Sequence, residues 1–99
     1  MPYFKASKIV NTNYKPVKVS SKVKPLHYRD RKPVKLVEGG YYFVSFGNNS
    51  AIRCVVIALP KEGENPDMIS IQVNNRKHSI YKDELGTTPE EAVQNQVTF

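Results

Sequence analysis

Lysine and arginine residues are concentrated in the first third of this 99-residue chain. Residues 1–36 contain ten basic residues and a single acidic residue, Asp30, which gives this stretch a formal charge of +9. Residues 37–99 contain five basic and eight acidic residues, so they carry a formal charge of −3. Basic side chains spread along an extended chain can follow a phosphate backbone and release its counterions. The charge distribution therefore predicts that the N-terminal segment binds a polyanion.

The residues expected to contact nucleic acid fall into a basic set and an aromatic set. The expected phosphate contacts are Lys15, Lys18, Lys22, Lys24, Arg29, Arg31, Lys32, Lys35, Arg53, Arg76 and Lys77. The aromatic candidates for stacking on unpaired bases are Tyr14, Tyr28, Tyr41 and Phe43. We expect sequence-independent binding of DNA or RNA. The alternative is an oligomeric structural or assembly protein, of the virion type or a protein-interaction module, whose basic arm packs on a neighbouring subunit or along its own domain.

Cys54 is the one candidate nucleophile, with His27 and His78 as candidate bases and Asp83 as an orienting acid. It lies in the middle of an apolar segment, where a free cysteine is typically a small buried hydrophobe whose thiol has a raised pKa. The chain contains no phosphate-loop motif, no HExxH, no paired-cysteine zinc motif and no GxSxG. We therefore expect a binding module and not an enzyme, with no metal, no cofactor and no small-molecule substrate.

The single cysteine also excludes an intramolecular disulfide, and with it a disulfide-stapled secreted fold. No apolar run approaches the roughly 18 residues that a membrane span requires, and the N-terminus lacks the apolar region of a signal peptide. We expect a cytoplasmic protein that makes no membrane contact.

Two β-hairpins are predicted in the second half of the chain. Residues 41–46 are aromatic or β-branched almost throughout, and the turn residues 47–50 lead into the apolar segment 51–59. Residues 68–73 alternate apolar and polar side chains, and Asn74-Asn75 suits a tight turn into residues 76–81. Alternation within 41–46 places Tyr41 and Phe43 opposite Tyr42, Val44 and Phe46, so one of these two sets is expected to be exposed.

The two ends of the predicted domain carry weaker signals. Residues 34–37 after Pro33 read as a short first strand that Gly39-Gly40 terminates. Near the C-terminus, Thr88 as N-cap, Pro89 at the first helical position and Glu91 as the partner in a capping box predict a short helix.

About five short strands with closely spaced turns indicate a mainly β fold with a short C-terminal helical turn. In strand count and turn spacing the pattern resembles the SH3-like or Tudor-like group of small open barrels, a likeness of fold class that transfers no function. We expect the barrel to span residues 33–99 and residues 1–32 to form an extended basic arm that becomes fully ordered only against a partner.

Overall fold

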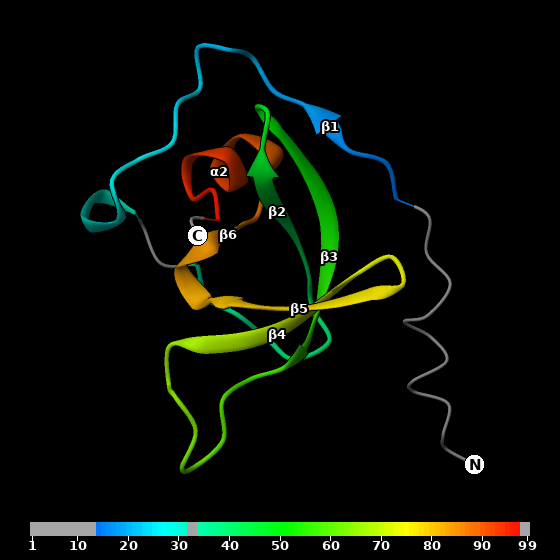
Figure 1. Cartoon of the computed structure of the whole chain (residues 1–99), viewed down its shortest axis with the longest axis vertical. Helices are drawn as coiled ribbons and strands as arrows, with labels where there is room; N and C mark the ends of the chain where they lie inside the picture. Colours follow the sequence, from blue (N-terminus) through cyan, green and yellow to red (C-terminus); the bar gives the residue numbers. More distant parts are fainter. Residues whose placement is uncertain (1–13, 32–33, 98–99) are drawn as a thin grey trace.

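The protein folds around a six-stranded antiparallel sheet, seen in a computed structural model that describes residues 14–31 and 34–97 (Figure 1). The strand order is β5-β4-β3-β2-β6, and β1 pairs with the beginning of β3. The elements are β1 (Val17–Lys18), the 3-10 turn η1 (Tyr28–Asp30), β2 (Tyr41–Gly47), β3 (Ser50–Ala58), β4 (Met68–Val73), β5 (Arg76–Tyr81), the 3-10 turn η2 (Lys82–Glu84), β6 (Leu85–Gly86) and α2 (Pro89–Gln94). The prediction of a mainly β fold with one short C-terminal helix is confirmed.

Both predicted hairpins are present, with the predicted residues in their turns. Gly47 pairs with Ser50 across the β2–β3 turn, where Asn48 and Asn49 have φ values of 59° and 49°. Positive φ at both central residues is the geometry whose twist matches that of the flanking strands, and asparagine tolerates it better than most residues. In the β4–β5 turn only the first central residue, Asn74, has a positive φ, of 53°.

The core lies on the face of the sheet that the alternating apolar residues share. Its buried members are Tyr42, Val44, Cys54, Val56, Ile69, Ile71, Ile80, Leu85 and Val97. They come from β2 to β6 and from the segment after α2, so the meander and the C-terminus close over one cluster. Cys54 is buried, as its position in an apolar strand predicts.

Helix α2 begins at the predicted cap. The Thr88 hydroxyl accepts a hydrogen bond from the Glu91 N–H, and Pro89 occupies the first helical position. The Glu91 carboxylate reaches one residue further back than a capping box requires, because Thr87 offers it both an N–H (2.6 Å) and a hydroxyl (2.9 Å). The helix packs directly over Gly86 of β6, where a Cβ atom would lie 2.4 Å from the Ala92 nitrogen.

The short first strand that we predicted at residues 34–37 is absent, and this prediction is wrong for the described residues 34–37. The hydroxyl of buried Tyr42 accepts a hydrogen bond from the Val37 N–H and donates one to the Lys35 carbonyl. These backbone groups are therefore satisfied by a side chain and do not need a strand partner. Position 33, where the predicted barrel domain began, lies outside the described residues.

Residues 14–31 pass around the β2–β3 hairpin and α2 (Figure 1). Strand β1 pairs with β3, the Val19 N–H donates to the Asn49 carbonyl, and the Leu26 N–H donates to the Gln94 carbonyl at the end of α2. The Asn49 side chain also donates to the carbonyls of Ser20 and Val23. This part of the predicted arm thus contacts its own domain, and residues 1–13 of the arm lie outside the described residues.

Over the described part of the chain, no helix combines the length and the apolar character that crossing a membrane would require.

Candidate nucleic-acid interface

Three of the predicted binding residues form a stack on the side of the sheet that faces away from the core. Phe43 of β2 and Arg53 of β3 are direct cross-strand partners, so their side chains leave the sheet on the same face. The Arg53 guanidinium carbon lies 5.3 Å from the centre of the Phe43 ring and 5.7 Å from the centre of the Tyr14 ring. Both distances lie within the range of about 6 Å for a cation–π contact. The sheet and the chain before β1 therefore hold one guanidinium group between two aromatic rings.

Tyr14 is fixed in this position by the β4–β5 turn. Its N–H donates to the Asn74 side-chain oxygen at 2.8 Å, and the Asn74 side-chain nitrogen donates to the Tyr14 carbonyl at 3.2 Å. Tyr14, Phe43 and Arg53 are all residues that we predicted from the sequence, whereas we predicted Asn74 only as a turn residue. No local pattern indicates its second role, because the partner of its side chain lies 60 positions away.

The stack belongs to a larger exposed surface, which we call the aromatic–basic face. The face consists of Tyr14, Tyr41, Phe43, Arg53 and Lys77. Tyr41 lies on the same side of β2 as Phe43 and is 58% exposed, whereas Tyr42 between them is buried. Lys77 joins the face through the register of the sheet: Tyr41 pairs with Val55, Val55 with Gln72, and Gln72 with Lys77.

Of the other exposed basic residues near this part of the sheet, Lys15 is next to Tyr14 in the chain. Lys18 and Arg76 are exposed at strand ends, but as the cross-strand partners of Ser50 and Val73 they leave the sheet on its other side. All nine acidic residues are among the described positions, and none lies in residues 14–29 or in strands β1 to β5. They lie in η1, the loops before β2 and after β3, η2 and α2: Asp30, Glu38, Glu62, Glu64, Asp67, Asp83, Glu84, Glu90 and Glu91.

The other predicted contacts are spread along the arm. Lys22, Lys24 and Arg29 are exposed between β1 and the end of η1, and Lys35 is exposed in the loop before β2. Lys32 lies outside the described residues. Tyr28 lies in η1, and its side chain is outside the described set. The structure therefore brings together the stack, Tyr41 and Lys77, with Lys15 next to Tyr14 in the chain, and it leaves the remaining basic residues further along the arm or on the other side of the sheet.

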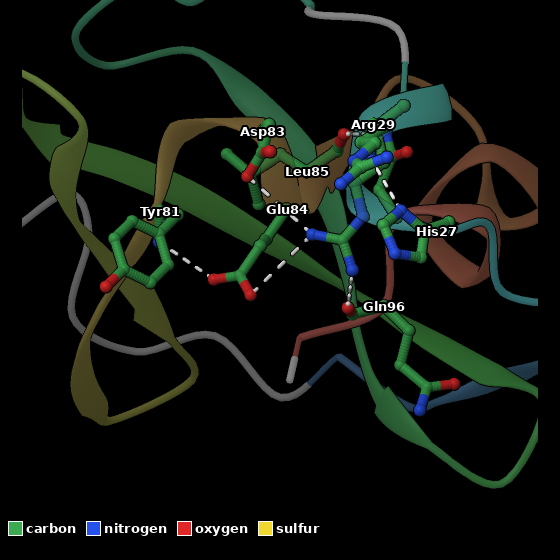
Figure 2. Close-up of polar contacts among 9 residues, drawn as sticks. His27, Arg29, Tyr81, Asp83, Glu84, Leu85 and Gln96 are labelled. Atoms are coloured by element: carbon green, nitrogen blue, oxygen red, sulfur yellow. Dashed lines mark hydrogen bonds and ion pairs between the residues drawn. The ribbon is translucent and has the colours of Figure 1, made fainter. Parts of the chain in front are cut away.

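Arg31 has a different role from the one that we predicted. Only 4% of its side chain is exposed, and its Nη2 donates to the Gln96 carbonyl at 2.7 Å. Its Nη1 lies 3.7 Å from a carboxylate oxygen of Asp83 and 3.8 Å from one of Glu84, whose side chain is 2% exposed (Figure 2). Because the guanidinium is committed to groups of its own domain, we leave Arg31 out of the interface. Nothing in the local sequence distinguishes it from its exposed neighbour Arg29.

The candidate catalytic residues are held in separate structural roles. Burial raises the pKa of the Cys54 thiol from 9.0 to about 12, against the opposing effect of a hydrogen bond with the Tyr42 backbone. The His78 ring packs on Phe46 with 5.0 Å between ring centres, and His27 Nδ1 accepts the Arg29 N–H at the start of η1. Asp83 faces Arg31. Within residues 14–31 and 34–97, no three histidine, cysteine or acidic side chains gather in a group that could hold a metal ion.

No protein-family model, curated protein or solved structure matches this chain. The candidate interface therefore rests on the placement of the residues themselves.

Proposed function

We propose that this protein is a non-enzymatic module that binds nucleic acid without sequence specificity, through the aromatic–basic face and the basic residues of the arm. The observation that carries the proposal is a group of exposed basic side chains that form no ion pair with any described carboxylate. They are Lys15, Lys18, Lys22, Lys24, Lys35, Arg53, Arg76 and Lys77. In contrast, Lys82 pairs with Asp67 at 3.5 Å and Arg31 is buried against its acids.

The separation of the charges supports a polyanionic partner. Acidic residues are missing from residues 14–29 and from strands β1 to β5, and the exposed basic side chains of the group named above form no ion pairs with described acids, so they keep a positive potential that intramolecular pairs do not cancel. Flexible lysines act as hydrated point charges that suit phosphate contacts at many registers. Phosphate contacts position a protein but carry no base information. Binding to this surface is therefore expected to depend strongly on salt and weakly on sequence.

The test is a salt titration of binding with a charge-removal variant. Lys15, Lys18, Lys22 and Lys24 are all exposed, so replacing the four by alanine leaves the core intact. The slope of log affinity against log salt should become shallower by up to about 0.9 per lost contact on duplex, or about 0.7 on single strands. A matched control replaces Lys61 and Lys82, which lie near acidic residues, and its slope should stay close to that of the wild type.

Two results would overturn the proposal. One is the absence of measurable binding to any DNA or RNA at about 50 mM salt. The other is an unchanged affinity and slope in the quadruple variant. A shift of that variant from oligomer to monomer on a sizing column would instead support the assembly protein, in which the arm engages another subunit.

We also propose that the sheet is an open barrel of the SH3-like or Tudor-like group. Strands β2 to β5 form a continuous antiparallel meander, the turn η2 follows, and β6 returns to pair with β2. This return, in which the chain passes from β5 at one edge of the sheet to β6 beside β2, supports a small open barrel. An experimental structure in which β6 pairs elsewhere would contradict this assignment.

A further inference from the structure

We propose that the aromatic–basic face binds unpaired bases, so that the protein prefers single-stranded nucleic acid to duplex. This inference rests on the proposed function and names its substrate class. Basic residues alone would favour duplex DNA at least as much, because its charge density is higher. The preference must therefore come from groups that recognise something a duplex hides, and the exposed Tyr41 ring and the half-buried Phe43 ring are such groups.

The rings are arranged as a platform for stacking. Tyr41 and Phe43 project from alternate positions of β2, which places them roughly 7 Å apart along one face of the sheet. A flexible strand can lay one base against the Tyr41 ring and a second against Phe43 or the Arg53 guanidinium that lies over it, since the π-face of a base stacks on either group. The bases of a duplex are already stacked on one another inside the helix, so they cannot reach a sheet surface without being unpaired.

Arg53 adds a cation that is ordered before any ligand arrives. Its guanidinium lies within cation–π distance of both the Phe43 ring and the Tyr14 ring, and the two hydrogen bonds between Tyr14 and Asn74 hold Tyr14. None of the described carboxylates forms an ion pair with Arg53. Its N–H groups can therefore donate to a phosphate or a base edge with little further loss of side-chain freedom.

The acidic residues limit where a strand can run. Helix α2 carries Glu90 and Glu91 and packs over Gly86, which is the β6 partner of Phe43. On the opposite side of Phe43 lie Arg53 and then Lys77, two strands further across the sheet. A phosphate backbone is expected to lie on this second side, over β3 to β5, with its bases turned toward β2.

The experiment compares a fluorescein-labelled oligothymidylate of about 15 nucleotides with a duplex of the same length, by fluorescence anisotropy. The wild type should bind the single strand more tightly. The double variant Tyr41→Leu, Phe43→Leu should lose at least roughly 30-fold in single-strand affinity, because stacking of two bases is lost at about 5-fold or more each, while its salt slope and duplex affinity stay the same. Tyr81→Leu is the control for loss of an exposed ring, because Tyr81 is 51% exposed, is not part of the aromatic–basic face and lies next to the acidic turn η2. Its single-strand affinity should stay close to that of the wild type.

The role of Asn74 is tested by a double-mutant cycle on the same two probes. Asn74→Ala should weaken single-strand binding in the wild-type background and have no further effect once Tyr14 is replaced by leucine, because its contribution passes through Tyr14. Equal losses in both backgrounds would show that Asn74 does not act by positioning this ring.

The outcomes separate the two proposals. If the wild type binds neither probe at low salt, the proposed function fails and this inference fails with it. If it binds duplex as tightly as single strand, or if the aromatic variant weakens both alike, nucleic-acid binding stands and the single-strand preference is overturned. The ratio of the two wild-type affinities decides the matter even if the double variant does not fold.

Discussion

Replacing Arg31 by methionine should destabilise the fold strongly, although Arg31 belongs to a segment that the sequence describes as a basic arm. Methionine keeps an unbranched apolar stem of similar length and removes the guanidinium. The Glu84 carboxylate would then remain buried without its cation, and the Gln96 carbonyl would lose a charge-assisted hydrogen bond of 2.7 Å. Removing one partner of a buried ion pair costs about 3–5 kcal/mol.

Three features of the site reduce this figure. Glu84 keeps its 2.8 Å hydrogen bond from the Tyr81 N–H, and Asp83, whose side chain is 38% exposed, can turn to water. The Arg31 Nε atom is buried without a partner, so its removal recovers a desolvation penalty on the order of 1 kcal/mol. We therefore expect a loss of about 2–4 kcal/mol in the free energy of unfolding. For a domain of this size that corresponds to a fall in Tm of roughly 10–25 °C.

The assay is urea unfolding followed by far-ultraviolet circular dichroism at neutral pH. Lys35→Met, at an exposed position outside any ion pair with a described acid, is the control and should change stability by no more than about 0.5 kcal/mol. Adding Glu84→Gln to Arg31→Met should recover part of the loss, because a neutral amide oxygen still accepts the Tyr81 N–H. A loss below about 1 kcal/mol in Arg31→Met, or a further loss on adding Glu84→Gln, would refute the reasoning.

Two further predictions concern the core and the helix. Cys54 should resist thiol reagents in the native state. Its pKa is about 12 in the folded protein and 9.0 in the unfolded chain, so above pH 9 the unfolded state binds fewer protons than the folded state. The free energy of unfolding should then fall, as the pH rises above 9, by up to about 1.4 kcal/mol per pH unit because of this thiol. Urea unfolding of the wild type and of Cys54→Ala between pH 8 and pH 10 isolates the contribution of the thiol, and parallel pH profiles of the two proteins would contradict it. Gly86→Ala should cost about 1–3 kcal/mol in urea unfolding, because the new Cβ would meet the backbone of α2 at 2.4 Å and the helix must move. Gly63→Ala, in open space at a φ of +88°, should cost only about 1 kcal/mol, and an equal loss in the two variants would argue against the close packing of α2 on β6.

Local chemistry made part of the fold predictable. The asparagine turns at 48–49 and 74–75 and the cap at Thr88 depend on φ preferences and on hydrogen bonds within a few residues, and all three are present. The prediction at residues 34–37 is wrong because a short apolar stretch does not show whether another strand is available to pair with it. In this protein the Tyr42 hydroxyl binds those backbone groups instead.

For the candidate interface, composition identified the basic and aromatic residues, and alternation along β2 separated the Tyr41 and Phe43 side from the core side. Composition did not show which cations remain exposed. Lys15 and Arg31 look equivalent in sequence, but Lys15 is exposed beside the stack whereas Arg31 is buried against Asp83, Glu84 and the Gln96 carbonyl.

The sequence by itself determined strands β2 to β5 and the turns of their two hairpins, because these follow from the conformational preferences and periodicity of neighbouring residues, and its composition determined the excess of positive charge. Only the tertiary structure decided that Tyr14 meets Asn74 and that Arg31 meets Gln96, contacts that span 60 and 65 positions of the chain. Whether a cation faces solvent or a buried carboxylate depends on how the chain closes over the sheet. That closure is fixed by packing between distant segments, which no local pattern encodes.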